Sequence, residues 1–168
     1  MDPRDPQQFL FYRLEREEIG ARNYARLSFA TCKLVARSVC RQYGVPQVRV
    51  RRKKMGKWAA EYDPNPTPKV ITLNPVRGTS TDLLTILHEL AHHIHQTLAP
   101  NEAEGQEIHG PQFVACYMSV LDTVRLIPRD AMAIVLQRRG IRYINPGPTV
   151  QSLRAALRGD KANTFKVR

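Results

Sequence analysis

The most constraining feature of the sequence is the run His88-Glu89-Leu90-Ala91-His92, which lies inside an apolar segment with helical periodicity. Positions four apart on an α-helix are rotated by only about 40° and are separated by about 6 Å along the axis. Both imidazoles therefore leave the same face and can bind one tetrahedral metal ion, with Zn–N distances of about 2.0–2.1 Å. Glu89 projects beside that position, where its carboxylate can take a proton from water. The pattern predicts a zinc site with a general base.

The residues around this HExxH motif decide between a metal site and a chance pattern on a solvated helix. Thr79 and Asp82 have the spacing of a capping box, and Pro100 marks the end of the segment. Apolar residues recur between these points with helical spacing, at Leu83, Leu84, Ile86, Leu87, Leu90, Ala91 and Ile94. The motif is therefore expected on a mostly buried helix, as a metal-binding pair requires.

A third ligand is expected downstream, because a catalytic zinc usually has three protein ligands and one open position. His95 shares the helix face but lies about 10.5 Å from His88 along the axis, too far for both rings to reach one ion. His93 points about 100° away from His92 and is expected to be a partly exposed polar residue. The remaining candidates are His109, which we favour, and three carboxylates of the preceding loop, Glu102, Glu104 and Glu107.

His109 opens a second segment with helical periodicity, His109-Gly110-Pro111-Gln112-Phe113 and the apolar residues that follow it. Proline is favoured in the first turn of a helix. The polar loop between the two helices could bring the start of the second one back against the first.

These two segments together resemble the SprT-like zinc metallopeptidases, in which an HExxH helix is followed by a helix that opens with HGxxF. The resemblance covers residues 79–125 best. It implies that His88, His92 and His109 are the zinc ligands and that Glu89 is the catalytic general base. It also implies a tight helix start at Gly110 and a core aromatic at Phe113. The chain differs from some bacterial members because it has no cysteine-rich zinc ribbon, so it looks like a compact form.

The pattern along the chain predicts a fold of the α+β class. Helix is expected over residues 7–43 with a break at Gly20 and a stop at Gly44, then over the HExxH segment, the His109 segment and residues 129–139. Strands are expected at 48–51, 58–62 and 69–73, with a turn around Met55-Gly56. Together with the resemblance, this order implies a minimal zincin-like core: an N-terminal helix, a small antiparallel three-stranded sheet, the active helix and further C-terminal helices. By analogy with zincins, the strand Val70 to Leu73 is expected to bind an extended substrate by strand addition.

Length and composition suggest one domain in a reducing compartment. Residues 1–145 are expected to form a single zincin-like metallopeptidase domain, and residues 146–168 a basic tail that is helical or partly disordered. No apolar run approaches the roughly 18 residues of a membrane span, and no secretory signal is expected at the N-terminus. Cys32, Cys40 and Cys116 form no CxxC pair, so a cytoplasmic protein without disulfides is expected.

The formal net charge of +11 makes nucleic acid a candidate partner. One basic cluster surrounds the expected hairpin and contains Arg49, Arg51, Arg52, Lys53, Lys54 and Lys57. Another occupies the final third of the chain from Arg125 onward, opposed there by Asp122, Asp130 and Asp160. The alternative is a solvated surface that serves solubility, since no base-reading motif accompanies the charge.

The residues therefore predict a Zn²⁺-dependent metallopeptidase that hydrolyses peptide bonds of protein substrates, with DNA-associated proteins among the candidates. Two alternatives remain: a nucleic-acid-binding protein with a structural zinc, and a zinc amide hydrolase that acts on another substrate. Tyr117 and Tyr143 could stabilise an oxyanion, but packing is the expected role of both.

Overall fold

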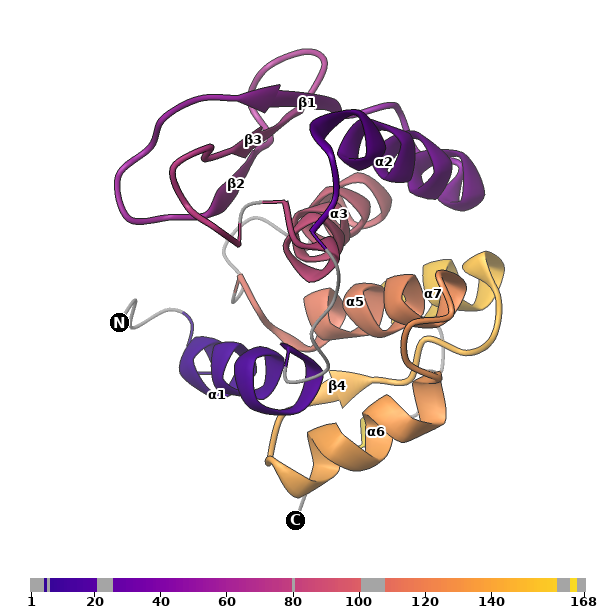
Figure 1. Cartoon of the computed structure of the whole chain (residues 1–168). Coiled ribbons are helices and arrows are strands. Elements are labelled where there is room, and N and C mark those ends of the chain that lie inside the picture. Colours follow the sequence, from indigo (N-terminus) through magenta and orange to yellow (C-terminus); the bar gives the residue numbers. More distant parts are fainter. Residues whose placement is uncertain are drawn as a thin grey trace. The chain divides into compact units, whose positions relative to one another are not determined.

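The computed structural model describes residues 5, 7–20, 26–79, 81–100, 108–159 and 164–165 (Figure 1). The chain forms two compact units, Met1–Arg22 with Leu98–Arg168, and Asn23–Thr97. Its helices and short strands confirm the predicted α+β class. None of the helices in the described part is both long enough and apolar enough to cross a membrane.

The unit Asn23–Thr97 begins with helix α2 (Phe29–Tyr43). Ser28 caps its start, because the hydroxyl oxygen accepts a hydrogen bond of 3.0 Å from the backbone N–H of Thr31. The helix ends at Gly44, whose φ of 60° is a left-handed conformation that glycine adopts without steric cost. The predicted stop at this glycine is confirmed.

Three strands and the HExxH helix follow in the same unit. They are β1 (Arg49–Arg52), β2 (Ala60–Asp63), β3 (Val70–Leu73) and all but the last residue of α3 (Leu83–Leu98). The strand order is β1-β3-β2, with β1 parallel and β2 antiparallel to β3. The sheet is thus mixed, whereas the sequence predicted an antiparallel one.

The composition of the strands explains this order. All four residues of β3 are buried, and three of them are apolar, so this strand takes the centre of the sheet. β1 and β2 carry the charged residues and take the edges, where water reaches them. The chain therefore does not turn back from β1 into an adjacent hairpin partner.

The central position of β3 also corrects the expected mode of substrate binding. Val70 pairs with Arg49 on one side and with Asp63 on the other, and the same double pairing continues to Leu73. Both edges of β3 are occupied, so an extended peptide cannot add to it. The open edges of this sheet belong to β1 and β2.

The other unit combines the N-terminal helices with the C-terminal half of the chain. Its elements are α1 (Gln8–Leu14), the π-helical turn η1 (Glu15–Ile19), α5 (Pro111–Thr123), α6 (Arg129–Arg138), β4 (Tyr143–Ile144), α7 (Val150–Leu157) and β5 (Thr164–Phe165). The predicted helix break at Gly20 is confirmed, because η1 ends at Ile19. The basic tail contains α7, and β5 pairs antiparallel with β4.

Helix α5 forms the core of this unit and nine of its residues are buried. Three aromatic rings join it to α1. Phe11 contacts Phe113 and Tyr117 edge-on, with ring centroids 5.3 Å apart in both pairs. Phe113 is fully buried, which agrees with the core position that the resemblance implied.

Candidate metal centre

Helix α3 places His88 and His92 on one face, one turn apart. Their Nε2 atoms lie 3.2 Å apart, and the ring centroids are separated by 4.9 Å. Two nitrogens bound to one tetrahedral zinc at about 2.0–2.1 Å are themselves about 3.3 Å apart. The pair therefore already has the separation that a shared zinc ion requires.

Glu89 lies next to His88 on the same helix and is 9% exposed. A carboxylate is rarely buried without a partner or a metal nearby. Its burial fits a group that acts inside a site rather than a solvated surface residue.

His109 lies two residues before α5 and is fixed by a residue from the beginning of the chain. The carboxylate oxygen Oδ2 of Asp5 accepts hydrogen bonds from Nδ1 at 2.6 Å and from the backbone N–H of His109 at 3.2 Å. The side chain of Gln7 donates to the carbonyl oxygen of His109 at 2.6 Å. Asp5 is fully buried and His109 is 2% exposed, so this arrangement is shielded from water.

The Asp5 contact determines which nitrogen of His109 can bind a metal. The carboxylate of Asp5 accepts a hydrogen bond from Nδ1–H, and a neutral ring with its proton on Nδ1 carries its lone pair on Nε2. Metal-binding histidines commonly donate their other ring N–H to a carboxylate in this way. Sequence reasoning missed Asp5, since it lies 104 residues from His109 and no local pattern connects them.

Three aromatic side chains hold the imidazole of His109 in place. Phe11 stacks on it with a centroid distance of 5.7 Å, and Tyr12 and Phe113 meet it edge-on at 5.0 and 4.9 Å. The helix that follows begins at Pro111, with Gly110 as its N-cap residue in an extended conformation. The predicted proline start of this helix is confirmed.

His93 differs from its expected state, because it is 1% exposed rather than partly exposed. Its Nε2 donates to the carbonyl oxygen of Pro46 at 2.8 Å, and its Nδ1 bonds the hydroxyl of Tyr62 at 3.3 Å. Burial lowers the pKa of His93, so the ring is neutral and Nδ1 accepts from Tyr62. Both nitrogens are used, and His93 joins α3 to the loop before β1 and to β2.

His95 is also buried, and burial lowers its pKa to about 4. Its Nε2 has no hydrogen-bond partner among the described residues. The carboxylates Glu102, Glu104 and Glu107, which were considered as ligands, lie outside the described residues. Tyr143 is buried and its hydroxyl accepts a hydrogen bond from Gln137 at 3.0 Å, which supports the expected packing role.

Among the described residues, one set of three side chains could hold a metal ion: His88, His92 and His109, each offering one ring nitrogen. These are the residues that the HExxH and HGxxF patterns single out. Comparison of the chain with protein-family models, with curated protein sequences and with solved structures found no match.

Proposed function

We propose that this protein is a zinc-dependent metallopeptidase in which His88, His92 and His109 bind the metal and Glu89 is the general base. The observation that carries the proposal is the 3.2 Å separation of the Nε2 atoms of His88 and His92 on α3. It matches two corners of a tetrahedral zinc site. Imidazole nitrogens are among the ligands that zinc prefers.

The Asp5–His109 pair supports the assignment of the third ligand. Asp5 holds the proton on Nδ1 and so keeps Nε2 in the form that binds a cation. When bound, zinc supplies a Lewis acid that polarises the scissile carbonyl and makes water acidic enough to react near neutral pH.

Glu89 performs the proton transfers of the proposed reaction. Its carboxylate takes a proton from the attacking water and passes it to the amine that leaves when the peptide bond breaks. The substrate would be an extended protein segment, and the open edge of β2 offers backbone groups for pairing with it.

The proposed site differs in its number of ligands from that of a nucleic-acid-binding protein with a structural zinc. A structural site is usually closed by four protein ligands. The described residues offer a set of three, which corresponds to a site with one position open to water and substrate. A zinc amide hydrolase with another substrate would use the same residues, so the substrate assay must separate it from a peptidase.

The test is hydrolysis of an unfolded protein by zinc-loaded protein, with Glu89→Gln as the matched control. A DNA-binding protein serves as a second substrate, with and without single- and double-stranded DNA. The expected result is cleavage by the wild type and cleavage slower by about 10²- to 10⁴-fold in Glu89→Gln, at equal zinc content. Stoichiometric zinc without cleavage of any protein would support a structural zinc. Cleavage of small amides alone would support the amide hydrolase.

A further inference from the structure

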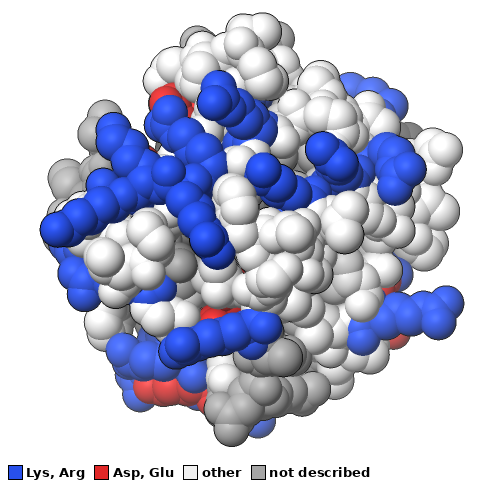
Figure 2. Space-filling model, turned by 45° about the horizontal axis from the view of Figure 1, so that its top comes forward, with Lys and Arg blue, Asp and Glu red and all other residues white. Residues whose placement is uncertain are grey.

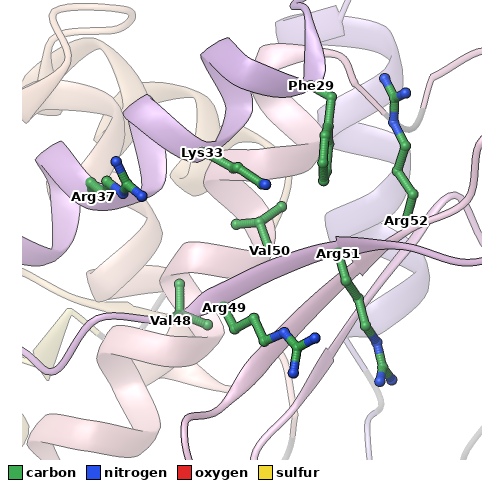
Figure 3. A pocket seen from close by; sticks show the side chains of 8 residues that line it. All are labelled: Phe29, Lys33, Arg37, Val48, Arg49, Val50, Arg51 and Arg52. Atoms are coloured by element: carbon green, nitrogen blue, oxygen red, sulfur yellow. The ribbon is translucent and has the colours of Figure 1, made fainter.

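A groove runs between α2 and β1 in the unit Asn23–Thr97 (Figure 3). It has a volume of about 430 Å³, within the usual range of ligand sites. Five basic residues and three apolar ones line it: Lys33, Arg37, Arg49, Arg51 and Arg52, with Phe29, Val48 and Val50. No acidic residue lines the groove, so it presents a single sign of charge.

The five cations of the groove have no carboxylate partner among the described residues. Arg51 donates from Nε to the hydroxyl oxygen of Thr72 at 2.9 Å, a neutral partner that orients the guanidinium and leaves its charge uncompensated. Figure 2 shows Lys and Arg side chains gathered on the face that carries α2 and β1, with few acidic side chains between them. This surface therefore keeps a strong positive potential.

The second basic cluster, in the C-terminal third, is different. Arg139 pairs with both Glu17 and Glu18 of η1, and Arg138 pairs with Glu18 at 3.4 Å. Arg129 pairs with Asp122 at 2.8 Å. From the sequence, only aspartates were expected to oppose the charge of this cluster. The two glutamates of η1 were not expected there. Three arginines of this cluster thus have carboxylate partners within the protein, unlike the cations of the groove.

Phe29 organises two of the cations in the groove. Its ring centroid lies 4.6 Å from Nζ of Lys33 and 4.5 Å from Cζ of Arg52. Figure 3 shows the ring between these two side chains, one from each wall of the groove. Cation–π contacts hold both charges in place, so less side-chain entropy is lost when an anion binds.

The spacing of the cations suits a polyanion with regular charges. Lys33 and Arg37 are one turn apart on α2, about 6 Å along the helix axis. Arg49 and Arg51 are two residues apart on β1, about 7 Å along the strand. Figure 3 shows Arg49 and Arg51 pointing away from α2, so the cations form two rows, and a chain that carries one negative charge per unit of similar length can meet those of either row in succession. Nucleic acid is such a chain, with one phosphate per nucleotide.

We propose that the groove between α2 and β1 binds the phosphodiester backbone of single-stranded nucleic acid. Four of the five cations are arginines, whose planar donors match phosphate oxygens. A basic groove that follows the backbone is the usual site for single strands. The cations already cover Phe29, so we expect little base stacking and little sequence preference. Val48 and Val50 are buried and cannot enter a bilayer, which argues against an anionic membrane as the ligand.

This proposal does not rest on the zinc site, and its test distinguishes failure of nucleic-acid binding from failure of the proposed peptidase function. The probe is a labelled oligothymidylate of about 20 nucleotides at about 50 mM salt, followed by fluorescence anisotropy. The variant Lys33→Gln/Arg37→Gln/Arg52→Gln should bind at least about tenfold more weakly. Its log–log salt slope should be shallower by about 2, since each single-strand phosphate contact contributes about 0.7. Phe29→Leu should weaken binding by about two- to fivefold.

The matched control removes three charges outside the groove: Arg16→Gln/Arg41→Gln/Arg125→Gln. All three arginines are exposed, and Arg41 lies on α2 beyond the groove, so the control also reports on changes to this helix. Its affinity should stay within about twofold of the wild type. Circular dichroism and zinc content should be unchanged in both triple variants, and hydrolysis of a free peptide should be unaffected.

Several outcomes would overturn the proposal. No binding of the oligothymidylate at low salt would do so directly. Equal losses in the two triple variants would show that binding follows net charge and not the groove. Tighter binding of a duplex of the same length, or of polyglutamate or anionic vesicles, with the loss confined to the groove variant, would assign the groove to that other ligand.

Discussion

The carboxylate of Asp5 binds His109 twice, at the ring Nδ1 and at the backbone N–H, with distances of 2.6 and 3.2 Å. One oxygen atom, Oδ2, accepts both hydrogen bonds. The contact fixes the tautomer and the position of the imidazole at the start of α5. It makes Asp5 a positioning residue for the proposed metal centre, although it does not bind the metal itself.

Removal of the Asp5 carboxylate is therefore expected to weaken zinc binding without abolishing it. Loss of such an outer contact typically reduces metal affinity by about 10- to 100-fold. Asp5→Ala should show this loss in a competition titration with a zinc chelator. The zinc affinity of Asp5→Asn should fall between those of Asp5→Ala and the wild type, because the amide oxygen of asparagine still accepts a hydrogen bond. Unchanged affinity in a folded Asp5→Ala protein would mean that Asp5 does not position His109 for the metal.

Replacing a histidine ligand should remove the zinc, whereas replacing Glu89 should leave the zinc bound and slow the reaction. His88→Ala, His92→Ala and His109→Ala should each lose most of the bound zinc, measured by elemental analysis after dialysis. Glu89→Gln should keep its zinc and lose about 10²- to 10⁴-fold in turnover, the usual contribution of a general base. Full zinc binding by His109→Ala would instead point to Glu102, Glu104 or Glu107.

His95 is expected to make stability depend on pH. Burial lowers its folded-state pKa to about 4, whereas an unfolded chain has the ordinary value of about 6.5. Between these values the unfolded state binds the proton and the folded state does not. The stability that the folded protein gains from keeping His95 neutral is therefore fully present above about pH 6.5. It is lost progressively as the pH falls toward 4, and its total is on the order of 3 kcal/mol.

Urea unfolding at several pH values, with a chelator present so that metal release does not contribute, measures this effect. His95→Leu removes the titrating group and should show a weaker dependence of the unfolding free energy on pH between 6.5 and 4. The same pH dependence in the variant and the wild type would assign the acid sensitivity to other groups.

The aromatic cluster that joins α1 to α5 is expected to be a major source of stability. Phe113→Ala should cost about 3–5 kcal/mol, because the ring is fully buried between Phe11, Tyr117 and His109. Phe9 lies on α1 with 54% of its surface exposed, and Phe9→Ala should change stability by less than about 0.5 kcal/mol. Chemical denaturation compares the two. Similar losses in both variants would contradict the packing described for α5.

Local features were well predicted by the sequence because they depend on residues only a few positions apart. The α-helical spacing alone places His88 and His92 on one face of α3. Gly44 ends α2, and Pro111 begins α5, for reasons that lie in their own backbone conformations. These signals also identified the histidines that could hold a metal ion.

Pairing between distant segments could not be read in this way. The sequence contained three strands but not their order, and only packing placed the apolar β3 between the charged strands β1 and β2. His93 was expected at a partly exposed position, since its burial depends on Pro46 and Tyr62 from other elements. Ion pairs between distant segments could not be predicted either, because Glu17 and Glu18 pair with an arginine about 120 residues away.

The sequence by itself thus determined where most helices lie, the helix boundaries at Gly44 and Pro111, the residues of the proposed catalytic motif and the excess of positive charge. Only the tertiary structure decided that Asp5 orients His109, and that Lys33 and Arg37 of α2 line one groove with the arginines of β1. The physical reason is one of range. Helix geometry and capping act over three or four residues, whereas a buried ion pair or a groove forms only when packing brings distant segments together.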